Sequence, residues 1–222
     1  MPEYVAGLSG ATPKEISWRK PFERWNRCEH DTAVNDFRIA MTQACSAHPE
    51  LTLTEWIPER VFWRETDRIT FSYTRGGKSI TDTRGVRPDG YFVVQQPGYS
   101  PSRFLFELDR ATEDHPRFIH EKLHAGVAYI KSPAYKQRFG YNAGRWLVVT
   151  SGEWRMRNLQ EKAALELGGV ATVFYFTTID HVRRFDRHAQ QATYHDVLTA
   201  AIWYQGASAT PTTLFKSYTR TP

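Results

Sequence analysis

The segment RPDGYFVVQQPGYSPSRFLFELDR (87–110) contains two apolar runs, at 91–94 and 104–106, with acidic residues at their ends. Asp89 comes just before the first run, and Glu107 and Asp109 come at the end of the second. Pro97, Gly98 and Pro101 interrupt the connection between the runs and are typical of a turn. The segment therefore predicts a β-hairpin with three carboxylates at one end.

A turn centred near Gly98 and Tyr99 pairs residues whose numbers sum to about 197, which places Asp89 opposite residues 107–109. Residues two apart in a strand share a face, so Glu107 and Asp109 are expected to point the same way. Clustered carboxylates repel one another unless a cation neutralises them. Because all-oxygen ligands suit hard cations, one interpretation of the cluster is a Mg²⁺ or Mn²⁺ site.

A structural interpretation of the same acids stays open. An aspartate before a glycine is a common turn residue, and Asp109 beside Arg110 is also typical of a solvated strand end. Glu113 and Asp114 have the position of acids in the first turn of a helix.

The rest of the chain alternates helical and strand patterns. The spacing of apolar residues predicts helices at 30–47, 114–131, 154–167 and around 195–204. Short apolar runs predict strands at 51–57, 61–63, 69–73, 146–150 and 170–177, with a turn at 74–79. This order predicts an α/β fold in which helices cover a mixed sheet.

Composition narrows the functional classes. The 222 residues carry a net charge of +5, with 41% hydrophobic residues and 24% charged residues, which is ordinary for a globular protein and permits a polyanionic partner. No apolar stretch reaches the length of a membrane helix and no signal peptide is apparent, so we expect a cytoplasmic protein without a membrane partner. Cys28 and Cys45 are too far apart along a helix to form a disulfide.

The residues PDG (88–90) and ELD (107–109), followed by a lysine-bearing helix, resemble the PD-(D/E)XK nuclease superfamily. The resemblance implies a restriction-endonuclease-like mixed β-sheet flanked by helices, with an αβββαβ core. It also implies metal ligation by Asp89, Glu107 and Asp109. Asp109 occupies the position at which the superfamily motif has lysine. Some members recruit that lysine from the following helix, which makes Lys122 the catalytic candidate here, with Tyr129 seven residues further along.

More closely, the chain resembles the replication-relaxation family of plasmids and other mobile elements. The resemblance covers about residues 25–180 and rests on CEHDTAVNDF (28–37), LTEWIPER (53–60), RPDGYF (87–92), FLFELDRATE (104–113), KLHAGVAYI (122–130) and WLVVTSGEWRMRNL (146–159). It implies a nuclease-like domain that works on DNA. Family members commonly carry a winged helix-turn-helix ahead of this region, so we expect that module to be absent or supplied by a protein partner.

These patterns predict an N-terminal arm (1–27), a nuclease-fold domain (28–180) and a C-terminal helix and tail packed on that domain (181–222). Possible supporting residues of the acidic site are His30, Asn35, Glu59 and Tyr129, although His30 and Asn35 also suit a helix-capping network and Glu59 suits an ion pair. The residues expected to line a phosphate-binding rim for DNA are Lys131, Lys136, Arg138, Arg145, Arg155 and Arg157, although basic residues on exposed faces are also commonly just solvated.

Two functions from different classes are consistent with these features. The first is a divalent-metal-dependent DNA endonuclease or nickase that hydrolyses phosphodiester bonds through Asp89, Glu107, Asp109 and Lys122. The second is a catalytically inactive DNA-binding accessory factor of replication or of a relaxosome, which the missing motif lysine favours. A weaker third interpretation is a protein–protein adaptor.

Overall fold

The computed structural model describes residues 25–110, 118–186 and 188–216. The chain divides into two compact units, Met1–Thr32 and Ala33–Pro222. The first unit contributes only residues 25–32 to the described part, and these form the beginning of helix α2 (Trp25–Ala47). Everything that follows concerns the second unit.

The centre of this unit is a six-stranded mixed sheet with the strand order β1-β4-β5-β6-β7-β10. The pairs β1–β4, β4–β5 and β7–β10 are antiparallel, whereas β5–β6 and β6–β7 are parallel. The strands are β1 (Thr52–Pro58), β4 (Gly90–Gln95), β5 (Ser102–Asp109), β6 (Arg145–Thr150), β7 (Phe174–Thr178) and β10 (Tyr204–Gln205).

Helices and two small antiparallel ribbons surround this sheet. The ribbons are formed by β2 (Asp67–Arg75) with β3 (Lys78–Val86) and by β8 (Arg183–Asp186) with β9 (Gln191–Tyr194). The remaining helical elements are α3 (Glu59–Arg64), the π-helix η1 (Ile119–His124), α5 (Ala125–Ile130), α6 (Pro133–Phe139), α7 (Glu153–Leu167), the 3₁₀-helix η2 (Gly168–Val173) and α8 (Ile179–Val182). None of the described helices is both long and apolar enough to span a membrane.

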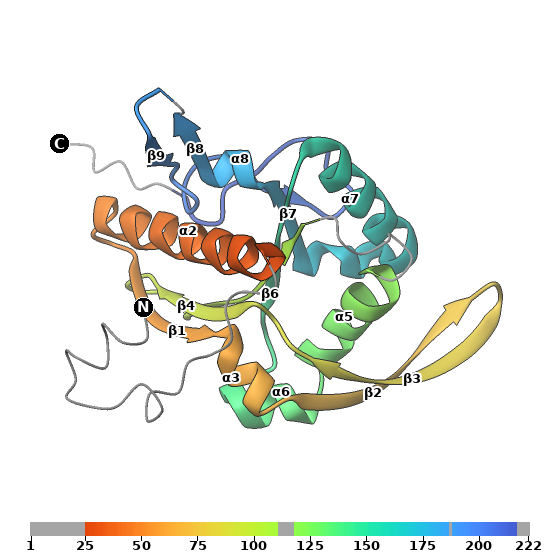
Figure 1. Ribbon diagram of the computed structural model, residues 1–222. Coiled ribbons are helices and arrows are strands. Elements are labelled where there is room, and N and C mark those ends of the chain that lie inside the picture. The colour runs from red at the N-terminus through yellow and green to blue at the C-terminus, as the bar shows by residue number, and fades with distance from the viewer. Residues whose placement is uncertain (1–24, 111–117, 187, 217–222) are drawn as a thin grey trace, which may run out of the picture. The chain divides into compact units, whose positions relative to one another are not determined.

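The sheet separates two hydrophobic cores. On one face, Leu105 and Trp146 pack with Leu123 and Leu159 from the helical layer of η1, α5 and α7. On the other face, residues of α2 and of the C-terminal segment cover the sheet, and the Phe37 ring stacks on Phe106 with centroids 4.1 Å apart. Figure 1 shows α2 on one side of β1 and β4, and α5 and α6 on the other. Because strands β4–β7 are buried on both faces, their sequences are continuous apolar runs.

Most of the predicted elements are present. The helices expected at 30–47 and 154–167 correspond to α2 and α7, and the strand expected at 146–150 corresponds to β6. The predicted hairpin is formed by β4 and β5. Gly90 lies opposite Phe106, so the numbers of paired residues add up to one less than predicted. Of the helix expected at 114–131, residues 114–117 lie outside the described part, and η1 and α5 form the rest.

Two predicted elements are wrong, and a third is wrong in part, since the strand expected at 170–177 begins only at Phe174, after the 3₁₀-helix η2. The run at 61–63 is helical (α3), because only Phe62 of its apolar residues is fully buried and Trp63 is 52% exposed. The C-terminal helix expected around 195–204 is replaced by turns. There, Asp196 Oδ1 accepts hydrogen bonds from the amides of Leu198 and Thr199, which competes with helix formation. The elements that were not predicted are helices α6 and α8 and strands β3, β8, β9 and β10.

Helix α5 lies unusually close to strand β6. The Trp146 indole donates a hydrogen bond to the Gly126 carbonyl at 3.2 Å. A Cβ atom at Gly126 would lie 2.9 Å from Trp146 Nε1 and 3.1 Å from Phe174 Cζ. Both rings are buried, so neither moves aside easily. The absence of a side chain at this position therefore sets the distance between the helix and the sheet.

We expect Gly126→Ala to lower the free energy of unfolding by about 1–2 kcal/mol, because overpacking outweighs the gain in helix propensity. Urea denaturation measures the change. Gly169→Ala is the matched control, since a Cβ there meets no described heavy atom within 4 Å. Equal stability of the two variants would show that the helix can move away from the sheet at no cost.

A polar cluster joins the end of α2 to the C-terminal segment. His48 Nε2 lies 2.6 Å from Asp196 Oδ2, and Thr199 donates its hydroxyl to the same carboxylate. Burial alone raises the pKa of Asp196, but the hydrogen bonds from Thr199, His48 and the Leu198 amide outweigh it, so the pKa lies below its ordinary value. The ionised carboxylate thus stabilises the fold.

A carboxylate whose pKa falls on folding stabilises the protein above its unfolded pKa, and the contribution is lost as the pH falls through the folded pKa. We expect Asp196→Ala to cost about 1 kcal/mol at neutral pH, as loss of a capping side chain does. The difference from wild type should shrink below about pH 4. Urea midpoints across this range measure it, and a difference independent of pH would contradict the role of the charge.

Candidate active site

Asp89 is held at the start of β4 by the hairpin. Its amide donates to the Phe106 carbonyl at 2.9 Å, and its Oδ2 accepts a hydrogen bond from the Leu108 amide at 2.7 Å. Since Gly90 pairs with Phe106, Asp89 lies opposite Glu107 on the neighbouring strand. Both residues are only 6% exposed. The hairpin register thus brings two buried carboxylates to one end of the sheet.

Lys122 approaches this pair from the helical layer. Its Nζ lies 2.7 Å from Glu107 Oε1, and its side chain remains 29% exposed. The lysine belongs to η1, a π-helical turn that continues directly into α5. Turns of this kind are rare and occur often at functional sites. The ammonium group therefore neutralises one of the two carboxylates and remains accessible to solvent.

These three residues line a pocket of about 390 Å³. Glu59 and Trp63 line it as well, with the Trp63 indole donating a hydrogen bond to Glu59. The remaining charged residues of the lining come from the β2–β3 ribbon and the segment after it, namely Arg68, Arg84 and Arg87. The pocket thus combines buried carboxylates with cationic groups, an arrangement suited to a phosphate ester beside a metal ion.

Asp109 has a different environment from Glu107, although the two share a face of β5. Arg155 of α7 binds it with two hydrogen bonds, Nε to Oδ2 at 2.7 Å and a terminal nitrogen to Oδ1 at 3.0 Å. Both side chains are buried, and neither lines the pocket. The geometry therefore does not support Asp109 as a third acid of the pocket, because α7 covers this end of the strand and supplies an arginine there.

The sequence matches the model of a known protein family. The family model described as replication-relaxation matches residues 6–143, which is more than half of the chain. The chain belongs to the replication-relaxation family. Membership implies a role in the replication or relaxation of plasmid DNA. No curated protein and no solved structure matches the sequence.

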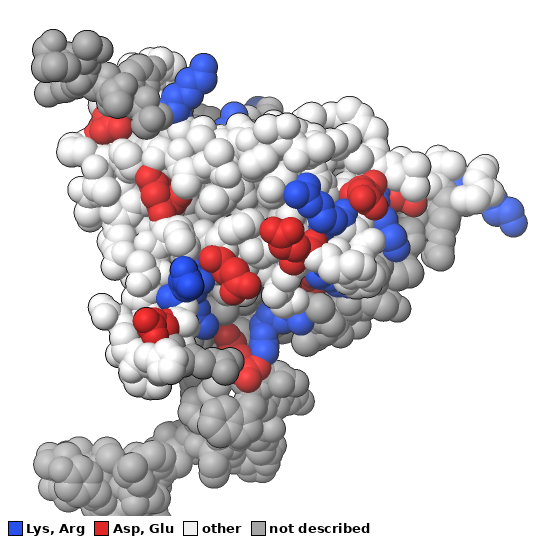
Figure 2. All heavy atoms as spheres, turned by 90° about the horizontal axis from the view of Figure 1, so that it is seen from above, with Lys and Arg blue, Asp and Glu red and all other residues white. Residues whose placement is uncertain are grey.

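The basic residues expected to bind DNA in this replication-relaxation protein do not line the pocket. Lys131, Lys136 and Arg145 are exposed, and none of them lines the pocket. Figure 2 shows basic and acidic side chains interspersed over the face that it presents. A single basic rim formed by these residues is therefore not apparent.

The three other arginines of that predicted rim make contacts within the fold. Arg155 is buried against Asp109, so its assignment to DNA binding is not supported. Arg138 forms hydrogen bonds to both carboxylate oxygens of Asp67, and the Arg157 guanidinium lies 3.9 Å from the Tyr204 ring centroid. These contacts give the arginines a structural role.

Tyr129 does not support the pocket, contrary to expectation. It is fully buried, and its hydroxyl donates to Asp67 Oδ2 at 2.5 Å. Burial raises its pKa above the ordinary value, and the hydrogen bond to Asp67 raises it further. Residues seven apart share a face only in a regular α-helix. The π-helical turn that contains Lys122 changes the rotation per residue, and with it the angle between Lys122 and Tyr129 about the helix axis.

The other supporting candidates have separate locations. Glu59 is half-buried in the pocket lining, as described above. Asn35 is exposed on α2 and does not line the pocket. His30 belongs to the first unit, and its predicted role stays a prediction.

Sequence reasoning missed Trp63, Arg68, Arg84 and Arg87. Arg87 packs its guanidinium 4.4 Å from the centroid of the Trp63 ring and donates a hydrogen bond to the Thr66 hydroxyl at 2.9 Å. The signal for Arg84 is the alternation of residues in 78–86, which identifies β3 and places Arg84 opposite Ile69, the residue after Arg68. The run was not recognised as a strand because hydroxyl residues occupy its exposed positions.

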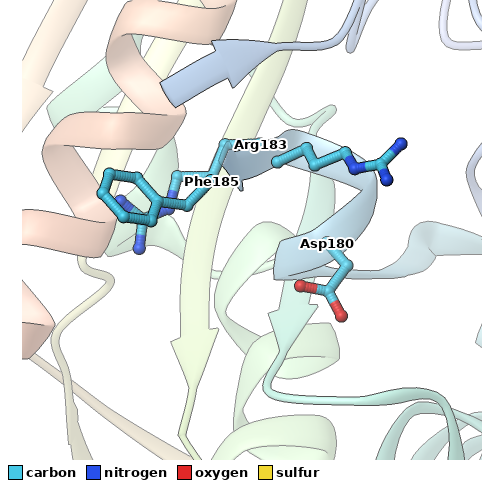
Figure 3. Close-up of a pocket in the computed structure, with 4 residues that line it drawn as sticks. Asp180, Arg183 and Phe185 are labelled. Carbon is cyan, nitrogen blue, oxygen red and sulfur yellow. The ribbon is translucent and has the colours of Figure 1, made fainter. Parts of the chain in front are cut away.

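A second hollow, of about 640 Å³, lies beside α8 and β8 (Figure 3). Asp180, Arg183, Arg184 and Phe185 line it. The Arg183 guanidinium forms an ion pair with Asp36 at 2.7 Å, which fixes β8 to α2. This hollow lacks the grouping of carboxylates and lysine that distinguishes the first pocket.

The Asp109–Arg155 pair makes a prediction about stability. We expect Asp109→Ala to lower the free energy of unfolding by about 3–5 kcal/mol, because it removes the carboxylate from a buried guanidinium. The double variant Asp109→Leu/Arg155→Met should recover most of the loss. Urea denaturation of both variants measures this, whereas an Asp109→Ala variant of wild-type stability would favour a role in the site.

Proposed function

We propose that this protein is a divalent-metal-dependent DNA endonuclease or nickase with its active site at Asp89, Glu107 and Lys122. The observation that carries the proposal is the meeting of these three side chains in one pocket, two from adjacent strands and one from a helix. Two carboxylates and a lysine are the functional groups expected of a PD-(D/E)XK-like phosphodiesterase.

The arrangement of elements supports the same proposal. Helix α2, strands β1, β4 and β5, helix α5 and strand β6 follow one another in the order αβββαβ, with the β2–β3 ribbon inserted after β1. A restriction-endonuclease-like core has this order. In such a core the catalytic carboxylates come from the central hairpin, which corresponds to β4–β5 here.

The donor set fits a hard divalent cation. Asp89 and Glu107 are buried and adjacent, and Lys122 neutralises only one of the two charges, so the remaining negative charge favours a bound cation. They offer only oxygen atoms, which suits Mg²⁺ or Mn²⁺. When bound, such an ion lowers the pKa of a water molecule and stabilises the leaving oxygen. Asp89 and Glu107 would hold it.

The chain's own residues supply positioning and charge. The Leu108 amide donates a hydrogen bond to Asp89 Oδ2 and so holds the carboxylate at the end of the hairpin. Lys122 contacts Glu107 and lines the pocket, and an ammonium group at this place suits the orientation of a water molecule or a phosphate oxygen. The arginines of the pocket lining favour binding of the phosphodiester anion.

A second function is favoured by one specific observation. The motif position at which lysine is expected holds Asp109, and Asp109 forms a buried ion pair with Arg155. If Lys122 does not replace the missing lysine, the protein is a DNA-binding accessory factor of replication or of a relaxosome on a nuclease-like scaffold. A protein partner with a helix-turn-helix module is compatible with either function.

The test is the nicking of supercoiled plasmid in the presence of Mg²⁺, Mn²⁺ or EDTA. We expect metal-dependent nicking by wild type and a loss of about 100-fold or more for Asp89→Asn, Glu107→Gln and Lys122→Met. Glu161→Gln, which removes an exposed carboxylate of α7, is the matched control and should retain activity. Wild-type protein that shifts the plasmid on a gel but leaves it uncut would favour the accessory factor.

A further inference from the structure

The ribbon of β2 and β3 is separate from the central sheet and has two different faces. Its strands pair along their whole length, and Gly76 and Gly77 form the turn with φ of +56° and +75°. Positive φ at both positions is characteristic of the tight turns that suit the twist of a hairpin. In Figure 1 the ribbon extends away from the helices beside it. Nine residues per strand give a length of about 30 Å.

One face of the ribbon belongs to the core. Ile69, Phe71 and Val86 are buried there, and α5 contacts both strands. This packing holds the base of the ribbon in a defined position against the helical layer. The position of the opposite face relative to the pocket is therefore fixed as well.

The opposite face is exposed and consists almost entirely of hydroxyl side chains. Its members alternate with the buried residues along both strands and are Arg68, Thr70, Ser72, Thr74, Ser79, Thr81, Thr83 and Gly85. No acidic residue occurs among them. Thr70 pairs with Thr83 and Ser72 with Thr81, each with oxygen atoms 2.8 Å apart. A hydroxyl pair uses one of its two donors internally, so one donor and several lone pairs remain for another partner.

Basic residues occur at both ends of the ribbon, where Arg68 belongs to the hydroxyl face and Arg84 and Lys78 alternate with it along β3. At its base, Arg68 lines the pocket together with Arg84 and Arg87. At the far end, Lys78 is exposed beside the turn, and Figure 2 shows basic side chains at the right-hand edge, where the ribbon ends. A neutral surface of hydrogen-bonding groups between cationic ends suits a polyanion whose charges repeat along its length.

We propose that duplex DNA lies along the hydroxyl face of the β2–β3 ribbon, with its sugar–phosphate backbone toward Thr70, Thr74 and Thr83, and that the ribbon directs a phosphodiester to the pocket. The second half of this proposal rests on the proposed nuclease function, whereas the DNA surface stands independently of it. Serine, threonine, lysine and arginine side chains are common donors to DNA phosphates, and such contacts position the duplex without reading its sequence. A length of about 30 Å corresponds to about nine base pairs.

The test is fluorescence anisotropy with a labelled 25-base-pair duplex, in EDTA so that cleavage plays no part. Thr74→Glu/Thr83→Glu places two negative charges on the face at positions that are not opposite each other. We expect this variant to bind at least about tenfold more weakly than wild type. The matched control is Thr52→Glu/Thr193→Glu, which makes the same substitutions at exposed strand positions elsewhere and should bind as wild type does.

A second variant keeps the test valid if the double variant fails to fold. Lys78→Gln should bind more weakly and reduce the slope of log K against log salt concentration by about 1. Ribbon variants that bind as tightly as wild type, or wild-type protein without affinity for the duplex at low salt, would overturn the proposal. Ribbon-dependent binding by a protein that does not nick plasmid would contradict the nuclease function and leave the DNA surface supported.

Discussion

The register between β4 and β5 is the constraint on which the site depends. The hydrogen bond from the Leu108 amide to the Asp89 carboxylate joins a side chain of one strand to the backbone of the next. Because side chains alternate along a strand, a shift of one residue would turn Glu107 to the opposite face, away from Lys122. The stacking of Phe37 on Phe106 opposes such a shift, since it would remove an aromatic ring from the other core.

Because of the same alternation, Glu107 and Asp109 lie on one face of β5, but their environments differ. Two helices cover that face at successive positions along β5, and each presents a cation to one carboxylate. The guanidinium of Arg155 binds Asp109 in a buried, two-bond geometry, which is typical of a structural pair. The ammonium of Lys122 remains accessible to solvent beside a pocket. The acids are therefore separated into a structural group and a candidate catalytic group by the helices above them.

Membership of the replication-relaxation family is consistent with the proposal that DNA binds at the pocket. The β2–β3 ribbon contributes Arg68 and Arg84 to the pocket, and its hydroxyl face continues beyond the pocket. Under that proposal, the inserted ribbon would extend the surface that contacts the duplex beyond the small central sheet.

The sequence by itself determined the order of the main helices and strands, the β4–β5 hairpin and the approximate meeting of Asp89 with Glu107, because these follow from local periodicity and turn residues. It also indicated Lys122 through a family resemblance. Only the tertiary structure decided that Asp109 pairs with Arg155 and that β2–β3 forms a two-faced ribbon beside the pocket. Those outcomes depend on which helix covers which end of a strand, and contacts between residues far apart in the chain leave no local pattern.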